Sequence, residues 1–100
     1  DPGCVTRISP GMATAAGAPG QIEMRNTGAP CRFQLWYNRA AGAQFRNIWV
    51  SVPPQNGEVV VVNPGLGYRP KPGFQGEDRF VVETIPNGRL YMTVRVLASE

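Results

Sequence analysis

The sequence predicts an all-β protein, a two-layer sandwich of about seven short strands in one domain that spans residues 1–100. Two observations support this prediction. Glycine and proline together make up 22 of the 100 residues (12 Gly and 10 Pro), and such a content favours short strands joined by tight turns. Short segments of alternating apolar and polar residues follow one another along the chain, whereas no apolar pattern of helical period has a convincing length.

Three strands are expected in the N-terminal half. Residues 4–8 form a candidate edge strand, and a loop rich in glycine, alanine and proline follows at residues 9–20. Residues 21–25 form a second short strand, which ends at a turn. The third strand covers residues 31–36, where apolar and polar side chains alternate. Its inward-facing residues are Cys31, Phe33 and Leu35, and its outward-facing residues are Arg32, Gln34 and Trp36.

A second alternating segment covers residues 47–52. The residues expected to face inward are Ile48, Val50 and Val52, and those expected to face outward are Asn47, Trp49 and Ser51. We expect this strand to pair with residues 31–36 in a hairpin whose register places Trp36 opposite Trp49. A turn at residues 53–57 leads into a further strand at residues 58–63.

The last two strands form a hairpin over residues 80–96. Its turn contains Pro86, Asn87 and Gly88, which suit a type I turn followed by a residue in the left-handed conformation. Such a loop would pair Ile85 with Arg89. Counting outward, the expected cross-strand pairs are Thr84 with Leu90, Val82 with Met92 and Phe80 with Val94.

Residues 68–80, with the sequence YRPKPGFQGEDRF, are expected to form a rigid corner that carries the chain from one sheet to the other. Pro70 and Pro72 hold an extended run without backbone donors, which should lie outside a sheet. Glycines at positions 73 and 76 permit sharp turns around an inward-pointing Phe74. Asp78 is expected to accept hydrogen bonds from nearby turn N–H groups.

The same stretch resembles a known signature. The pattern YxPxPGFxGxDxF of bacterial Ig-like and cadherin-like domains is matched by Tyr68, Pro70, Pro72, Gly73, Phe74, Gly76, Asp78 and Phe80. Upstream, Pro54, Asn56 and Gly57 are similar to the family's PxNGxV hairpin, and residues 90–96 resemble its last strand. The resemblance covers residues 50–97 and implies an Ig-like β-sandwich in a periplasmic or surface protein. It does not explain the N-terminal half.

The cysteines favour an oxidising compartment. Cys4 and Cys31 are the two cysteines, and the chain has no histidine, so a structural zinc site lacks ligands. A disulfide is the favoured interpretation, with two reduced core thiols as the alternative. Because the chain opens at Asp1 without methionine, we expect a mature protein, periplasmic or secreted to the cell surface after removal of a signal peptide. No apolar run is long enough to cross a bilayer.

Composition disfavours several functions. The net charge is +3, from nine arginines and one lysine against seven acidic residues, and the basic residues form no strong cluster, whereas nucleic-acid binding requires a concentrated basic face. Serines have no histidine to activate them, and adjacent Glu77 and Asp78 point to opposite faces of a strand. We therefore predict no enzyme activity, no cofactor and no metal site. Weak calcium binding by Glu77 and Asp78 is an alternative to a structural role for Asp78 in its own turn.

The aromatic residues give the sharpest functional prediction. Trp36 and Trp49, flanked by Arg32, Gln34 and Asn47, would form an exposed partner-binding patch. The alternative is a core position, since Ig-like sandwiches commonly bury a tryptophan on the strand that contains Trp36. The predicted function is a non-catalytic interaction or structural subunit of a bacterial cell-envelope or surface assembly, which binds protein partners or further copies of itself. A carbohydrate-binding or adhesion module that stacks sugars on the two tryptophans is the second hypothesis.

Overall fold

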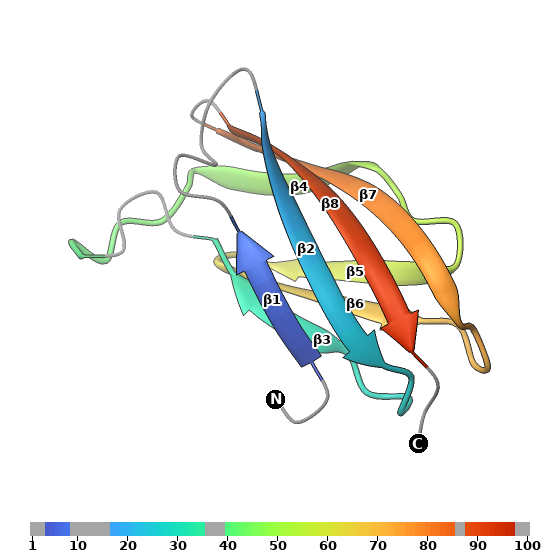
Figure 1. Cartoon of the computed structure of the whole chain (residues 1–100). Coiled ribbons are helices and arrows are strands. Elements are labelled where there is room, and N and C mark those ends of the chain that lie inside the picture. Colours follow the sequence, from blue (N-terminus) through green and yellow to red (C-terminus); the bar gives the residue numbers. More distant parts are fainter. Residues whose placement is uncertain (1–3, 9–16, 36–39, 86–87, 98–100) are drawn as a thin grey trace.

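The computed structural model, which describes residues 4–8, 17–35, 40–85 and 88–97, is a sandwich of two β-sheets (Figure 1). The predicted all-β sandwich is confirmed, with eight strands in the described residues rather than about seven. The strands are β1 (Cys4–Ile8), β2 (Ala18–Arg25), β3 (Cys31–Gln34), β4 (Asn47–Val52), β5 (Gly57–Val62), β6 (Gly65–Pro70), β7 (Gly76–Ile85) and β8 (Gly88–Leu97). No helix in these ranges is long and apolar enough to span a membrane.

The two sheets differ in size. The larger sheet has the strand order β1-β2-β8-β7-β4, and the smaller one has the order β3-β6-β5. Strands β2 and β8 pair in parallel, with Ile22 opposite Val94, whereas the other pairs are antiparallel. The parallel pair places an early strand beside the last one, so residues far apart in the sequence form the centre of the larger sheet.

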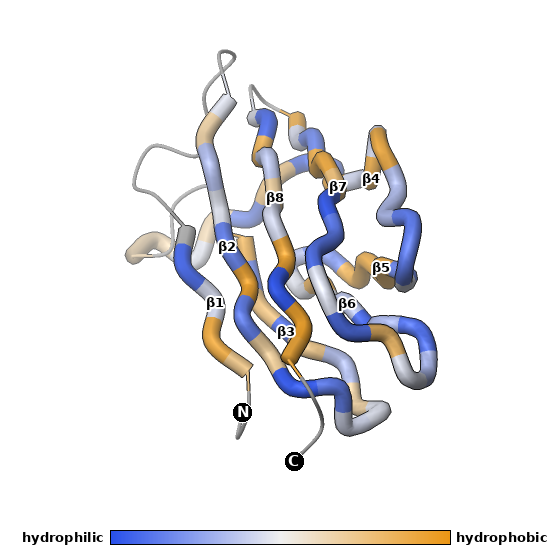
Figure 2. The backbone as a smooth tube through the Cα atoms, turned by 45° about the vertical axis from the view of Figure 1, so that its right-hand side comes forward, coloured by the Kyte–Doolittle hydropathy of each residue, from blue (hydrophilic) through white to orange (hydrophobic). Residues whose placement is uncertain are grey.

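The core lies between the sheets and follows the alternation of the strands, which is visible along β2 and β8 (Figure 2). The predicted burial of Cys31, Phe33 and Leu35 is confirmed. The larger sheet adds Ile22, Met24, Ile48, Phe80, Val82, Leu90, Met92, Val94 and Val96, and the smaller one adds Leu66 and Tyr68. Burial of these side chains provides the main favourable term for folding.

The predicted disulfide between Cys4 and Cys31 is confirmed, with Cα atoms 5.8 Å apart. Cys4 lies on β1 of the larger sheet and Cys31 on β3 of the smaller one, and both are edge strands. The bond therefore links the two sheets along one side of the sandwich. The opposite side ends in β4 and β5, which follow one another along the chain through a short connection.

The prediction that the proline run lies outside a sheet is wrong for Pro70. It is the last residue of β6, the central strand of the smaller sheet, where it pairs with Gly57. Gly65, Gly67 and Pro70 are poor strand formers, so the sequence pattern did not reveal this eighth strand. Pairing with β3 and β5 on both sides outweighs those local preferences, and a proline at the strand end removes little of the hydrogen-bond ladder.

The C-terminal hairpin is present, but its predicted register is wrong by two residues. Thr84 pairs with Gly88 instead of Leu90, and Val82 pairs with Leu90. Because side chains repeat every two residues, both registers bury the same faces, and the apolar pattern could not separate them. At Gly88 a Cβ atom would collide with the hydroxyl of Thr84, so a larger residue there would force the Thr84 side chain to move. Pro86 and Asn87 lie outside the described residues.

The predicted hairpin between residues 31–36 and 47–52 is also wrong. Strand β3 belongs to the smaller sheet, where it pairs with β6, and β4 is the edge of the larger sheet, where it pairs with β7. Strands that follow one another usually pair, but the connection here is long enough to cross from one sheet to the other. The two segments therefore lie in different layers.

The corner at residues 68–80 is organised by one buried carboxylate. Tyr68 donates its hydroxyl to Asp78 Oδ2 at 2.8 Å, and the turn N–H groups of Gln55 and Asn56 donate to the two carboxylate oxygens at 3.0 Å each. The N–H of Arg79 adds a fourth bond at 2.9 Å. Asp78 thus connects the turn between β4 and β5 with strands β6 and β7. The predicted hydrogen bonds from turn N–H groups are present, and the bond from Tyr68 adds to them.

Tyr68 connects this carboxylate to the core. Its ring stacks on Phe80 with the centroids 5.8 Å apart. Burial, followed by the hydrogen bond to Asp78, raises the pKa of the Tyr68 hydroxyl well above its usual value. The hydroxyl therefore stays protonated and keeps donating to Asp78. As predicted, the corner carries the chain from the smaller sheet to the larger one.

We expect Gly76→Val to lower the free energy of unfolding by about 2 kcal/mol, because Gly76 has a φ of 135°, a region closed to β-branched residues. A Cβ there would stay 3.6 Å from Phe74, so the cost arises from the backbone. Gln75→Val is the matched control, since Gln75 is exposed and the positive φ belongs to the adjacent Gly76. Chemical denaturation of both variants measures the difference, and equal stability would contradict this account of the corner.

Candidate functional site

The structure separates the residues that the sequence placed in one patch. Asn47 and Trp49 lie on β4, on the outer face of the larger sheet, whereas Arg32 and Gln34 lie on β3, on the outer face of the smaller sheet. Trp36 lies outside the described residues. Because β3 and β4 occupy different layers, Arg32 and Trp49 cannot contribute to one flat surface. Two separate surfaces replace the predicted patch.

The first surface is the Trp49 face, a cluster on the outer side of β4, β7 and β8. Trp49 is 37% exposed, so the prediction that its side chain points outward is confirmed. Opposite Trp49 across the sheet lies Glu83, and Arg89 lies opposite Glu83. The face is formed by Asn47, Trp49, Val52, Glu83, Ile85, Arg89 and Tyr91.

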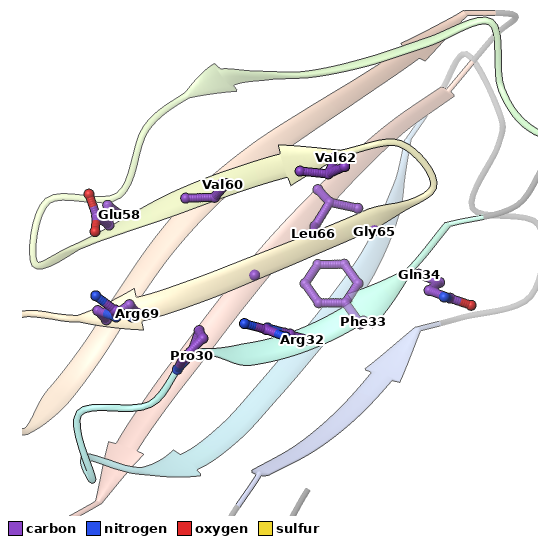
Figure 3. A pocket seen from close by; sticks show the side chains of 11 residues that line it. Pro30, Arg32, Phe33, Gln34, Glu58, Val60, Val62, Gly65, Leu66 and Arg69 are labelled. Atoms are coloured by element: carbon purple, nitrogen blue, oxygen red, sulfur yellow. The ribbon is translucent and has the colours of Figure 1, made fainter.

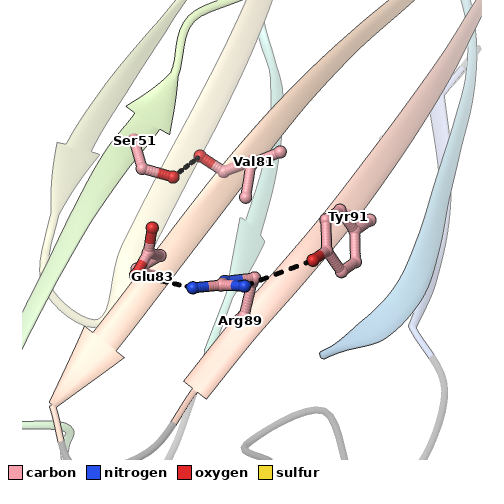
Figure 4. A network of polar contacts seen from close by, with 5 residues as sticks. All are labelled: Ser51, Val81, Glu83, Arg89 and Tyr91. Atoms are coloured by element: carbon pink, nitrogen blue, oxygen red, sulfur yellow. Dashed lines mark hydrogen bonds and ion pairs between the residues drawn. The ribbon is translucent and has the colours of Figure 1, made fainter. Parts of the chain in front are cut away.

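Polar contacts organise the centre of the Trp49 face (Figure 4). The guanidinium of Arg89 lies between two partners, Glu83 Oε1 at 3.7 Å and the Tyr91 hydroxyl oxygen, which accepts a hydrogen bond at 3.4 Å. The contact with Tyr91, followed by the charge of Glu83, raises the pKa of Arg89. The arginine is therefore charged and held beside Tyr91.

A β-bulge adds Val52 to this face. The pairing of β4 with β7 shifts between Val50 and Val52, so that Val52 lies opposite Val81. Val81 points away from the core, and Val52 does the same, with about half of its surface exposed. The sequence-based prediction that Val52 faces inward is therefore wrong. Strict alternation cannot anticipate a bulge, because the extra residue reverses the side-chain direction after it.

Tyr91 gives the face a second exposed aromatic ring. It is 45% exposed and lies against the backbone of Gly17, where a Cβ atom would collide with the ring. The ring is thus supported on one side and open on the other. Tyr91 was missed at the sequence level although the signal was present, since it alternates with the inward-facing Leu90 and Met92.

The other half of the same outer face has a different character. Cross-strand neighbours there are Val5, Glu23, Arg95 and Glu77, and Arg7 lies nearby on β1. Charges of both signs alternate across these strands, as on an ordinary solvated surface. The exposed apolar side chains Trp49, Val52, Ile85 and Tyr91 are therefore gathered on one half of the sheet. An exposed apolar cluster of this kind marks interaction surfaces.

Nothing in the described residues arranges groups for metal binding. They contain no cluster of three or more His, Cys, Asp or Glu that could hold a metal ion. Both oxygens of Asp78 accept hydrogen bonds from surrounding donors, so a cation would meet N–H and O–H hydrogens instead of free lone pairs. The hydroxyl of Ser51 donates to the carbonyl oxygen of Val81 at 3.4 Å. These contacts are structural.

The fold and surface define a small disulfide-linked β-sandwich with an apolar and aromatic face on its larger sheet. Neither the protein-family models nor the curated proteins compared with the chain match it. The resemblance to bacterial Ig-like and cadherin-like domains therefore stays a prediction based on the corner motif.

Proposed function

We propose that this chain is a non-catalytic interaction subunit of a bacterial cell-envelope or surface assembly, and that it binds a protein partner through the Trp49 face. The observation that carries the proposal is the convergence of Trp49, Val52, Ile85 and Tyr91 on one half of the larger sheet. Tryptophan, tyrosine and arginine are the residues most enriched at the energetic centres of protein interfaces. The face presents all three types, with Arg89 beside Tyr91.

The proposed location rests on the disulfide and on the corner motif. A disulfide persists in the periplasm or outside the cell, where it is not reduced. The resemblance at residues 68–80 points to the same compartments. The absence of histidine from the sequence and the structural use of Asp78 support a role without catalysis.

We expect Trp49→Ser to leave the protein folded and to weaken partner binding by about 30-fold or more, because truncation of a central aromatic residue costs about 2 kcal/mol at an interface. The matched control is Val5→Ser, which removes an exposed apolar side chain from the opposite edge of the same sheet. The measurement is quantitative affinity enrichment from envelope fractions of the native cell, combined with melting curves of the three proteins.

The proposal requires that the wild type and Val5→Ser enrich the same protein and that Trp49→Ser loses it at an unchanged melting temperature. Equal enrichment by all three proteins would refute the assignment of the face. Binding to a glycan panel that depends on Trp49, without any protein partner, would support the carbohydrate-binding hypothesis instead. The paired-tryptophan form of that hypothesis assumed a hairpin between residues 31–36 and 47–52, whereas β3 pairs with β6 and β4 with β7.

A further inference from the structure

The outer face of the smaller sheet contains a groove that runs along its central strand (Figure 3). Its volume is about 720 Å³. Two of the three outward positions of β6 in the groove, Gly65 and Gly67, have no side chains, so the backbone of β6 forms the floor there, and Arg69 is the third. Side chains from β3 and β5 form the two walls, which stand about 10 Å apart because each strand spacing is about 4.8 Å. That width fits one extended chain.

One end of the groove, around Val62, is apolar, and Val60 extends this apolar surface to the middle of the groove. Val60 and Val62 on β5 are 59% and 73% exposed, the highest values among the large apolar side chains described. Across the sheet, Val60 faces Gly67 and Val62 faces Gly65, so no side chain of β6 covers either valine. The edges of Phe33 and Leu66 reach the same end from below. Apolar side chains of a bound molecule would find an uncovered surface here.

Basic side chains lie on the wall that faces Val60 and at the other end of the groove. Arg32 lies opposite Gly67, and Arg69 lies two residues further along β6, so the two arginines are diagonal neighbours on one face. Glu58 is the one acidic side chain in the lining and lies opposite Arg69. Among the described residues neither guanidinium makes an ion pair or a side-chain hydrogen bond. Two arginines and one glutamate leave an excess positive charge that a carboxylate would neutralise.

We infer that this groove is a second binding site, and that its occupant is an extended peptide segment of a partner protein with aliphatic side chains followed by acidic ones. Alternate residues of an extended chain point to the same side about 6–7 Å apart. Two aliphatic residues can therefore contact Val62 and Val60, while an acidic residue one step further along meets Arg69, and its carboxylate is within the diagonal reach of Arg32. Arginine binds carboxylates in bidentate geometry, which adds orientation to the contact.

This site is independent of the Trp49 face, because it lies on the opposite sheet. A chain with binding surfaces on both sheets would join two partners. The two assignments can also fail separately, since Trp49→Ser leaves every residue of the groove unchanged.

The test uses a defined probe, an acetylated and amidated octapeptide with the one-letter sequence TVTVTETE. The control probe TVTVTKTK has the same apolar residues and the opposite charge. Binding is measured by calorimetric titration and by chemical-shift mapping on the isotope-labelled full chain. We expect the acidic probe to bind at least tenfold more tightly than the basic one, with shifts concentrated at residues 30–34 and 58–69.

Three variants locate the contact. Arg32→Glu combined with Arg69→Glu should weaken the acidic probe at least tenfold and improve the basic one, whereas Arg7→Glu, on the other sheet, should change neither affinity more than about twofold. Gly67→Val should fill the floor of the groove and abolish binding. A Cβ at this position lies 3.5 Å from Arg32 Cγ and 3.7 Å from Pro30 Cβ, which are ordinary contacts, so the variant should fold.

Absence of saturable binding by the acidic probe would overturn the inference, as would equal affinity for both probes. Binding that survives Gly67→Val in a folded variant, or shifts that gather around Trp49 instead, would also overturn it.

Discussion

Asp78→Ala is expected to lower the free energy of unfolding by about 3–5 kcal/mol, the largest effect of any single substitution discussed for this chain. The carboxylate is 5% exposed and accepts four hydrogen bonds, from the Tyr68 hydroxyl and from three backbone N–H groups. Alanine would leave these donors without their acceptor in a buried place. Bonds to a charged acceptor contribute about 1.5–3 kcal/mol each, although their sum is not additive.

Two variants bracket this prediction. Tyr68→Phe removes one of the four donors and should cost about 1–3 kcal/mol. Glu77→Ala changes the exposed neighbour on the same strand and should stay within about 0.5 kcal/mol of the wild type. Urea denaturation with the midpoint and slope measured for each protein gives the comparison. If Asp78→Ala were as stable as Glu77→Ala, the corner would not depend on its carboxylate.

Removal of the disulfide is expected to have the second large effect. The bond spans 27 residues between Cys4 and Cys31, and a cross-link of this length stabilises by about 3–4 kcal/mol in the chain-entropy model. The double variant Cys4→Ala, Cys31→Ala should therefore unfold at much lower denaturant concentration, and a reducing agent should shift the wild type by a similar amount. The reducing agent should not change the denaturant midpoint of the double variant.

The control for this prediction is a direct test of whether the disulfide is present in the native protein. Mass analysis under non-reducing conditions should give a mass lower than that of the free-thiol chain by two hydrogen atoms. Two alkylatable thiols in the native protein, or a double variant as stable as the wild type, would contradict both the stabilising role of the bond and the compartment inferred from it.

Local alternation predicted much of the core but not the arrangement of the strands. It identified the inward-facing set of residues 31–35, because a strand with one buried face has a period of two. It missed β6, since Gly65, Gly67 and Pro70 form a strand only when β3 and β5 pair on both sides. Sheet membership depends on contacts across the whole chain, which no segment encodes alone.

The sequence likewise predicted some residues of the candidate surfaces and not others. The outward direction of Trp49 followed from its neighbours, and Tyr91 could have been found by the same reasoning. Val52 could not, because the bulge that exposes it depends on how β4 meets β7. The groove could not be predicted either. It needs Gly65 and Gly67 in the centre of a sheet, with Val60 and Arg32 on either side, whereas the sequence pattern predicted no strand at residues 64–67.

The central claim is that the Trp49 face binds a protein partner, and site-specific photo-crosslinking tests it most directly. A photoreactive phenylalanine analogue in place of Tyr91 would sit within the face and leave the core unchanged, and the same analogue at Val5 is the control on the far edge of the sheet. On irradiation of native envelope fractions, we predict a discrete covalent adduct with one protein from position 91 and none from position 5. Equal adducts from both positions, or none from position 91, would contradict the claim.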